Sequence, residues 1–140
     1  MKNEKKSNRF RQALDLPILC NLNPRSIYNK TDEFHELVKE EDIDVVFLSE
    51  SWEREYLPLD QIIQLEDHMV ISNVHQRRGM GGRPAIIANK KKYQVQNLTS
   101  TDVQIPWGVE AVWCVLTPKN VTHDSKIQKI ACCAIYSIPD

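Results

Sequence analysis

Asp44-Val-Val-Phe-Leu-Ser49 is the stretch that decides the fold, because every residue between its polar ends is apolar. A continuous apolar run of this length is typical of a strand buried on both faces, so we expect a central strand. Upstream, Leu16-Pro-Ile-Leu-Cys-Asn-Leu22 predicts a second buried strand that ends near Asn21. Between them, residues 30–41 carry apolar side chains along one helical face. The sequence therefore predicts a strand–helix–strand unit.

This unit is expected to bring two polar side chains to one place. Parallel strands joined by a right-handed crossover have their carboxyl ends at the same edge of the sheet, where open α/β sheets bind ligands. Asn21 lies at the end of the first strand, and Glu50 follows the second. Carboxylate and amide oxygens suit Mg²⁺ better than zinc. The alternative, which the spacing leaves open, is a turn asparagine and the start of a solvated acidic run.

The rest of the chain predicts one short helix and several more strands. The expected elements are a helix over residues 58–65, a glycine-rich loop over residues 77–84, and strands over residues 69–72, 84–89, 93–97, 109–116 and 130–136. The strands on either side of Asn89-Lys-Lys-Lys92 are expected to form a hairpin. Alternating strands and helices predict an α/β fold.

Length and composition narrow the class of protein. The chain has 140 residues, and about 100–200 residues form one domain. We expect a polar, disordered N-terminus over residues 1–14 and one folding unit over residues 15–140. No apolar run approaches the roughly 20 residues of a membrane helix, so we expect a soluble, intracellular chain with no membrane partner. The four cysteines are expected to be reduced thiols, mostly buried.

Charge is concentrated in two blocks of opposite sign. Residues 31–55 hold ten acidic and two basic residues, whereas residues 75–92 hold six basic residues and no acidic one. A basic track beside an acidic cluster predicts a polyanion-binding surface next to a cation site. The candidate nucleic-acid contacts are Arg77, Arg78, Arg83, Lys90, Lys91 and Lys92. The alternative is a solvated helix face beside an exposed loop.

Four motifs in order carry a family resemblance. They are Ile18-Leu-Cys-Asn-Leu-Asn-Pro-Arg-Ser26, Asp44-Val-Val-Phe-Leu-Ser-Glu-Ser-Trp52, Arg78-Gly-Met-Gly-Gly-Arg-Pro-Ala-Ile86 and Ala134-Ile-Tyr-Ser-Ile-Pro139. Together they resemble the endonuclease/exonuclease/phosphatase superfamily. More narrowly, they resemble the apurinic-endonuclease-like domain of non-LTR (LINE-type) retrotransposons.

The resemblance implies a fold, an activity and a set of site residues. The fold would be the N-terminal half of a four-layer α/β/β/α sandwich, and the activity would be metal-dependent phosphodiester hydrolysis of DNA. By this resemblance Glu50 ligates Mg²⁺ or Mn²⁺, Asn21 supports the metal site, and Tyr136 contacts the scissile phosphate. A retrotransposon protein of this kind would act in the nucleus.

The resemblance also covers only the first half of the family's domain. The later Asp-x-Asn and Ser-Asp-His motifs, which supply the water-activating groups, have no counterpart here. It therefore implies a truncated chain that lacks cleavage activity and self-associates through uncovered apolar strand faces. The alternative function is a non-catalytic nucleic-acid-binding or protein-interaction fragment.

Overall fold

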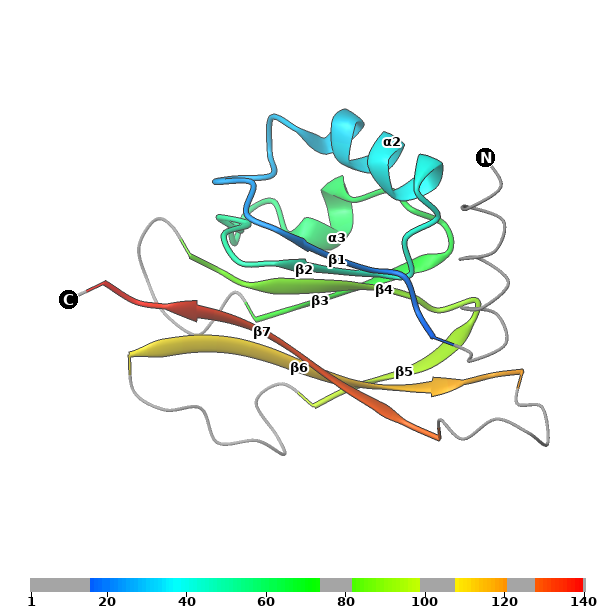
Figure 1. Ribbon diagram of the computed structural model, residues 1–140. Coiled ribbons are helices and arrows are strands. Elements are labelled where there is room, and N and C mark those ends of the chain that lie inside the picture. The colour runs from blue at the N-terminus through cyan, green and yellow to red at the C-terminus, as the bar shows by residue number, and fades with distance from the viewer. Residues whose placement is uncertain (1–15, 74–81, 99–107, 121–127, 140) are drawn as a thin grey trace.

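Two β-sheets and two helices lie in three layers in the computed structural model, which describes residues 16–73, 82–98, 108–120 and 128–139 (Figure 1). The N-terminal segment 1–14, expected to be disordered, lies outside these residues. The helices are α2 (Thr31–Glu40) and α3 (Leu59–Ile62). The first sheet has the order β1 (Leu19–Leu22), β2 (Val45–Leu48), β4 (Ala85–Asn89) and β3 (His68–Ser72). The second has the order β5 (Tyr93–Asn97), β6 (Val109–Pro118) and β7 (Ile130–Ser137).

The strand–helix–strand prediction is confirmed. β1 and β2 pair in parallel, with Asn21 opposite Phe47, and α2 forms the crossover between them. β2 also pairs with β4 on its other edge, so it is a central strand as expected. The helix predicted over residues 58–65 is reduced to the four residues of α3.

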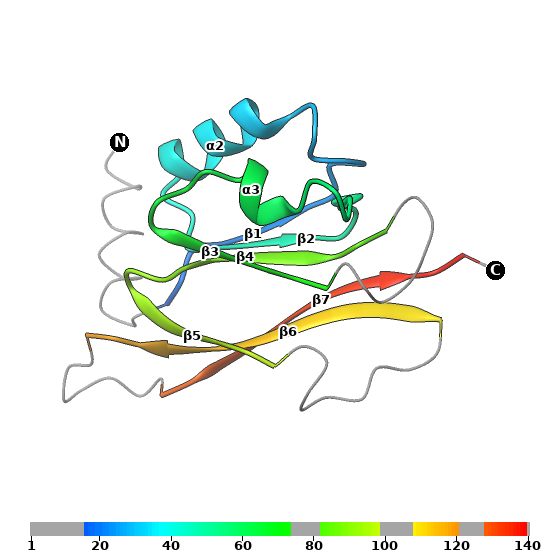
Figure 2. The same cartoon turned by 180° about the vertical axis from the view of Figure 1, so that it is seen from behind.

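Two apolar cores meet at the first sheet because side chains alternate along its strands. Val46 and Leu48 of β2 face the helices, whereas Val45 and Phe47 face the second sheet. Both helices cover the same face of the first sheet, as the reversed view shows (Figure 2). The fully buried residues of the helix-side core include Ile27, Val46, Leu48, Leu59, Ala85 and Ile87. Those of the inter-sheet core include Val45, Ile71, Ile86, Ala88, Val112, Cys114 and Leu116.

The predicted hairpin is wrong. β4 pairs with β2 and β3, whereas β5 pairs with β6, so the chain crosses from one sheet to the other at the Asn89-Lys-Lys-Lys92 turn. The reason lies in burial. β4 is buried at all five positions and has a strand on each edge, whereas β5 is largely exposed and anchors Tyr93 in the inter-sheet core. The turn itself forms as a hairpin turn would, because Asn89 Oδ1 accepts hydrogen bonds from the main-chain amides of Lys91 and Lys92.

The fold is therefore mixed α/β with two sheets. Within the described ranges the fold has one helical layer. The second helical layer of a four-layer sandwich is not formed by these residues. All four cysteines are free thiols; Cys114 and Cys132 are buried, whereas Cys20 and Cys133 are half-buried. No helix in the described part of the chain is long and apolar enough to cross a membrane.

A buried carboxylate joins three strands at the end of the sheet where β2 begins. Asp44 is 3% exposed, and its Oδ2 accepts a hydrogen bond from the main-chain amide of Ile18 at 2.9 Å. Its Oδ1 accepts one from Asn89 Nδ2 at 3.3 Å and lies 3.1 Å from Lys92 Nζ. One side chain thus ties the residue before β1 to the last residue of β4 and the turn beyond it.

We expect Asp44→Asn to lower the free energy of unfolding by about 1.5–3 kcal/mol, the usual worth of hydrogen bonds to a charged group. The amide would direct an N–H group at a donor, either the Ile18 amide or Asn89 Nδ2. Asp42→Asn is the matched control, because Asp42 is 80% exposed and lies 3.9 Å from the same Lys92 Nζ. Asp42→Asn should lower the free energy of unfolding by less than about 1 kcal/mol. Urea denaturation measures both, and equal losses would contradict the assignment.

His35 makes the stability of the helical layer depend on pH. Its Nε2 accepts a hydrogen bond from the Gln64 amide at 3.0 Å, which joins α2 to the segment after α3. Burial first, and then the charge of Lys39, lower the pKa of His35 below its usual value. Because the folded pKa lies below the unfolded pKa, protonation favours the unfolded chain. The stabilisation is present above the unfolded pKa and is lost as pH falls through it toward the folded pKa.

We therefore expect the free energy of unfolding to fall more for the wild-type chain than for His35→Gln between about pH 7.5 and about pH 5.5, around the ordinary histidine pKa. Glutamine also offers an oxygen acceptor to Gln64 but does not titrate. Urea denaturation across this range gives the two profiles. Parallel profiles would show that His35 does not couple folding to proton binding.

Candidate functional site

The carboxyl ends of β1 and β2 meet at one edge of the first sheet. Asn21 lies on β1, and Glu50 lies two residues beyond the end of β2. The Ser49 amide donates to the Leu22 carbonyl at 3.2 Å, which continues the parallel pairing past the last strand residues. The crossover topology therefore brings both predicted residues to the same edge.

The Glu50 carboxylate is half-buried and held by two side-chain donors. Asn23 Nδ2 donates to its Oε1 at 3.4 Å, and Trp52 Nε1 donates to its Oε2 at 3.2 Å. Asn23 is itself fixed, because its Oδ1 accepts a hydrogen bond from the Arg25 amide at 3.1 Å, as in an Asx turn. The asparagine that contacts Glu50 is thus Asn23 rather than Asn21, which lies two positions earlier, and both asparagines are exposed.

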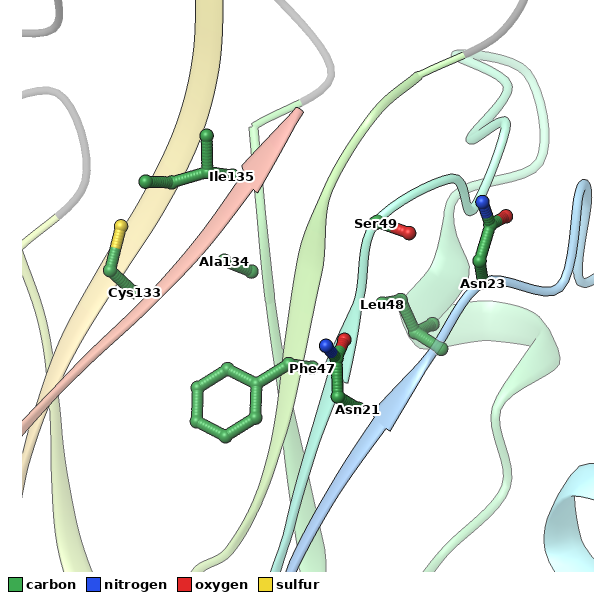
Figure 3. A pocket seen from close by; sticks show the side chains of 8 residues that line it. All are labelled: Asn21, Asn23, Phe47, Leu48, Ser49, Cys133, Ala134 and Ile135. Carbon is green, nitrogen blue, oxygen red and sulfur yellow. The ribbon is translucent and has the colours of Figure 1, made fainter. Parts of the chain in front are cut away.

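An open pocket of about 660 Å³ lies between the edges of the two sheets, and Asn23, which donates to Glu50, is one of its lining residues. Figure 3 shows the Phe47 ring reaching from β2 toward β7, with Asn21 next to it on β1. The residues that line the pocket are Asn21, Asn23, Phe47, Leu48, Ser49, Cys133, Ala134 and Ile135. The first sheet therefore contributes two amides, a hydroxyl and two apolar residues, whereas β7 contributes small or apolar side chains. Glu50 directly follows the lining residue Ser49.

Three loops are bonded together around Glu50. The Ser26 amide donates to the Glu50 carbonyl at 3.0 Å, which joins the loop after β1 to the loop after β2. The Ser51 amide donates to the Arg83 carbonyl at 3.2 Å, and the Trp52 amide donates to the Gly82 carbonyl at 3.1 Å. The segment before β4 is thereby attached to the same loop.

The same loops hold most of the positive-φ residues of the described chain. Arg25, Ser26, Trp52 and Arg83 have φ values of 45°, 79°, 59° and 64°. Such conformations cost on the order of 1–3 kcal/mol each for residues other than glycine, and they concentrate at functional sites. Their position supports this edge of the first sheet as the candidate functional site.

Two buried charged residues connect the loops to the second sheet. Arg83 is 6% exposed and Glu110 of β6 is 1% exposed. The Arg83 main-chain amide donates to Glu110 Oε1 at 3.3 Å. Glu110 pairs directly with Tyr136 across β6 and β7. Tyr136 is half-buried and shares the inward-facing register of Cys132 and Ala134. Its pairing with Glu110, which contacts Arg83, places it at the same end of the molecule as Glu50.

The basic residues that adjoin in sequence are separated in space. Arg77 and Arg78 lie outside the described residues. Arg83 is buried at the Glu50 end of β4, whereas Lys90-Lys-Lys92 follows the opposite end of that strand and is exposed. Lys92 lies 3.1 Å from Asp44. One continuous basic track from Arg83 to Lys92 is therefore not formed by these residues.

The donor atoms beside the pocket fit a hydrated Mg²⁺ or Mn²⁺. Glu50 supplies one carboxylate and Asn21 an amide oxygen, and both are hard oxygen ligands. Mg²⁺ usually keeps several waters and takes one or two carboxylates together with substrate phosphate. In the part of the chain that the structure describes, no group of three or more His, Cys, Asp or Glu side chains is placed to hold a metal. The fit is thus to a cation with one carboxylate ligand.

Sequence reasoning missed Asn23, Ser51, Trp52 and Glu110. Asn23 and Trp52 sit within the motifs, but nothing in their spacing says that they contact Glu50. Glu110 did leave a signal, because it is a carboxylate inside the apolar run Val109-Glu-Ala-Val-Trp-Cys-Val-Leu116. Its inward register, shared with Val112 and Cys114, marks it as a buried acid.

A scan against protein-family models and searches of curated proteins and of solved structures found no match to this chain. The endonuclease/exonuclease/phosphatase resemblance therefore depends on the four sequence motifs and their order.

Proposed function

We propose that this chain carries the metal-binding part of a phosphodiesterase site, directed at DNA and of the endonuclease/exonuclease/phosphatase type. The observation that carries the proposal is the Glu50 carboxylate at the carboxyl-end edge, oriented by Asn23 and Trp52 beside an open pocket. This edge is where α/β sheets bind ligands. The order of the four sequence motifs supports the same proposal.

Each residue has a role that its position supports. Glu50 would hold Mg²⁺ or Mn²⁺, with Asn21 as a neighbouring amide and Asn23 fixing the carboxylate. A bound Mg²⁺ supplies neutralisation of charge on the phosphate and on the departing oxygen. The Tyr136 hydroxyl would donate a hydrogen bond to the phosphate from the β7 side.

Cleavage also needs a group that activates water. General-base catalysis contributes about 10²–10⁴-fold to the rate of such reactions. Within the described ranges, Glu50 is not joined by the further acids or histidines that such a site requires. We therefore propose binding of metal and phosphodiester by this chain, and hydrolysis only when a second segment supplies the base.

The test is plasmid nicking in the presence of Mg²⁺. The chain alone should not nick, whereas a fusion of the full chain to the second half of a related endonuclease domain should. Glu50→Gln in that fusion should lower the rate about 10²–10³-fold, because a weakened metal site loses electrostatic stabilisation of the transition state. Asp42→Asn in the same fusion is the control and should leave the rate unchanged. Nicking by the fusion that does not depend on Glu50 would refute the proposal.

A second candidate function is non-catalytic nucleic-acid binding, and the lysine turn favours it. Lys90 and Lys91 are exposed, and Lys119 Nζ donates to the Lys90 carbonyl at 2.7 Å, which brings a third cation to the turn. Lys92 is the exception, because Asp44 neutralises it. Three ammonium groups on one turn form a compact phosphate-binding surface.

We expect Lys90→Gln/Lys91→Gln to weaken DNA binding and to flatten its salt dependence. Each lost phosphate contact reduces the slope of log K against log salt by about 0.9, so the double variant should lose about 1.8. Fluorescence anisotropy with a labelled duplex measures the slope, and Lys39→Gln on α2 is the control. An unchanged slope would exclude the lysine turn as the binding surface.

A further inference from the structure

The loop that carries Glu50 is anchored through the residue that follows it. Ser51 is fully buried, and its hydroxyl donates to the Arg83 carbonyl, which also accepts from the Ser51 amide at 3.2 Å. The same hydroxyl accepts a hydrogen bond from the Glu53 amide at 3.3 Å. One buried hydroxyl thus fixes the loop internally and attaches it to the segment before β4.

Arg83 is in turn held by the second sheet. Its φ of 64° directs its carbonyl toward Ser51 while its amide donates to Glu110 Oε1 at 3.3 Å. Glu110 belongs to β6, which lies across the inter-sheet core from β4. Contacts therefore run from Glu110 through the Arg83 main chain to Ser51, the residue next to Glu50.

Burial of the Glu110 carboxylate carries a desolvation cost. A buried carboxylate costs several kcal/mol of desolvation, and an apolar side chain of similar volume is often equally stable or better. The side chains that follow it on the inward face of β6 are the apolar Val112, Cys114 and Leu116. Glu110 provides, as a leucine would not, an acceptor for the strained Arg83 amide, at the strand position paired with Tyr136.

We propose that Glu110 and Ser51 are positioning residues that set where the Glu50 carboxylate stands relative to the second sheet. The inference rests on the proposed function, because it treats Glu50 as the metal ligand. The inference goes beyond that function, because it names two residues that would orient the metal ligand without contacting the metal or the phosphate. Glu50 follows a strand of the first sheet and Tyr136 belongs to the second, and the Glu110–Arg83–Ser51 contacts link the two.

The experiment measures Mn²⁺ binding by the full chain from the electron paramagnetic resonance signal of free Mn²⁺. Ser51→Ala and Glu110→Met should each weaken binding about 10-fold, the usual effect of removing a residue that orients a metal ligand. Glu110→Gln keeps an oxygen acceptor for the Arg83 amide and should bind close to the wild-type affinity. Asp44→Asn, which destabilises the opposite end of the sheet, should also bind as the wild type does.

The outcomes separate the two proposals. If Glu50→Gln abolishes binding while Ser51→Ala and Glu110→Met bind normally, the positioning role is wrong and the metal site stands. If Asp44→Asn weakens binding as much as Ser51→Ala, the effect reflects lost stability, and the positioning role is wrong. If the wild-type chain does not bind Mn²⁺, or Glu50→Gln binds equally well, both proposals fail. If Glu110→Met does not fold, the comparison of Mn²⁺ binding by Ser51→Ala and by Asp44→Asn decides whether the positioning role is right.

Discussion

The burial of β2 is the constraint on which the rest of the structure depends. Its side chains alternate between the helix-side core and the inter-sheet core, and both of its edges are paired, by β1 and β4. No polar side chain fits such a strand, so polar groups gather at its two ends. Asp44 precedes it and holds the neighbouring segments together, whereas Glu50 follows it beside the pocket. One end of the strand is thus structural, and the other is available for chemistry.

The sequence was sufficient where a local pattern determines the structure. The apolar run of β2 and the helical face of α2 are local features, and the general rule for parallel crossovers then places Asn21 and Glu50 at one edge. The hairpin prediction failed because the turn chemistry of Asn89-Lys-Lys-Lys92 is the same whether the following strand pairs with β4 or leaves its sheet. The choice depends on β3 already occupying the other edge of β4, which is a long-range pairing. The Arg83–Glu110 contact spans 27 residues and was unpredictable for the same reason.

Basic residues that are close in sequence lie at opposite ends of β4. β4 separates Arg83 from Lys90, and its five residues span on the order of 17 Å at the usual strand rise. This exceeds the Debye length of about 8 Å at physiological salt, so the lysine turn contributes little to the potential at Glu50. A single polyanion could reach both ends, but only by lying along the sheet. The Glu50 edge and the lysine turn are therefore better regarded as two surfaces than as one.

Backbone strain at the Glu50 edge is the strongest structural sign that this end is more than a set of connections. Four residues other than glycine hold positive φ in the loops that meet there, and together they cost several kcal/mol. Glycine at these positions would remove that cost, as Gly82 already does beside Arg83. The strain persists because main-chain hydrogen bonds join all three loops, and because Ser51 and Glu110 bond to the Arg83 main chain from opposite sides. A stable connection between strands does not require this arrangement, whereas a carboxylate held at a fixed distance from a second sheet does.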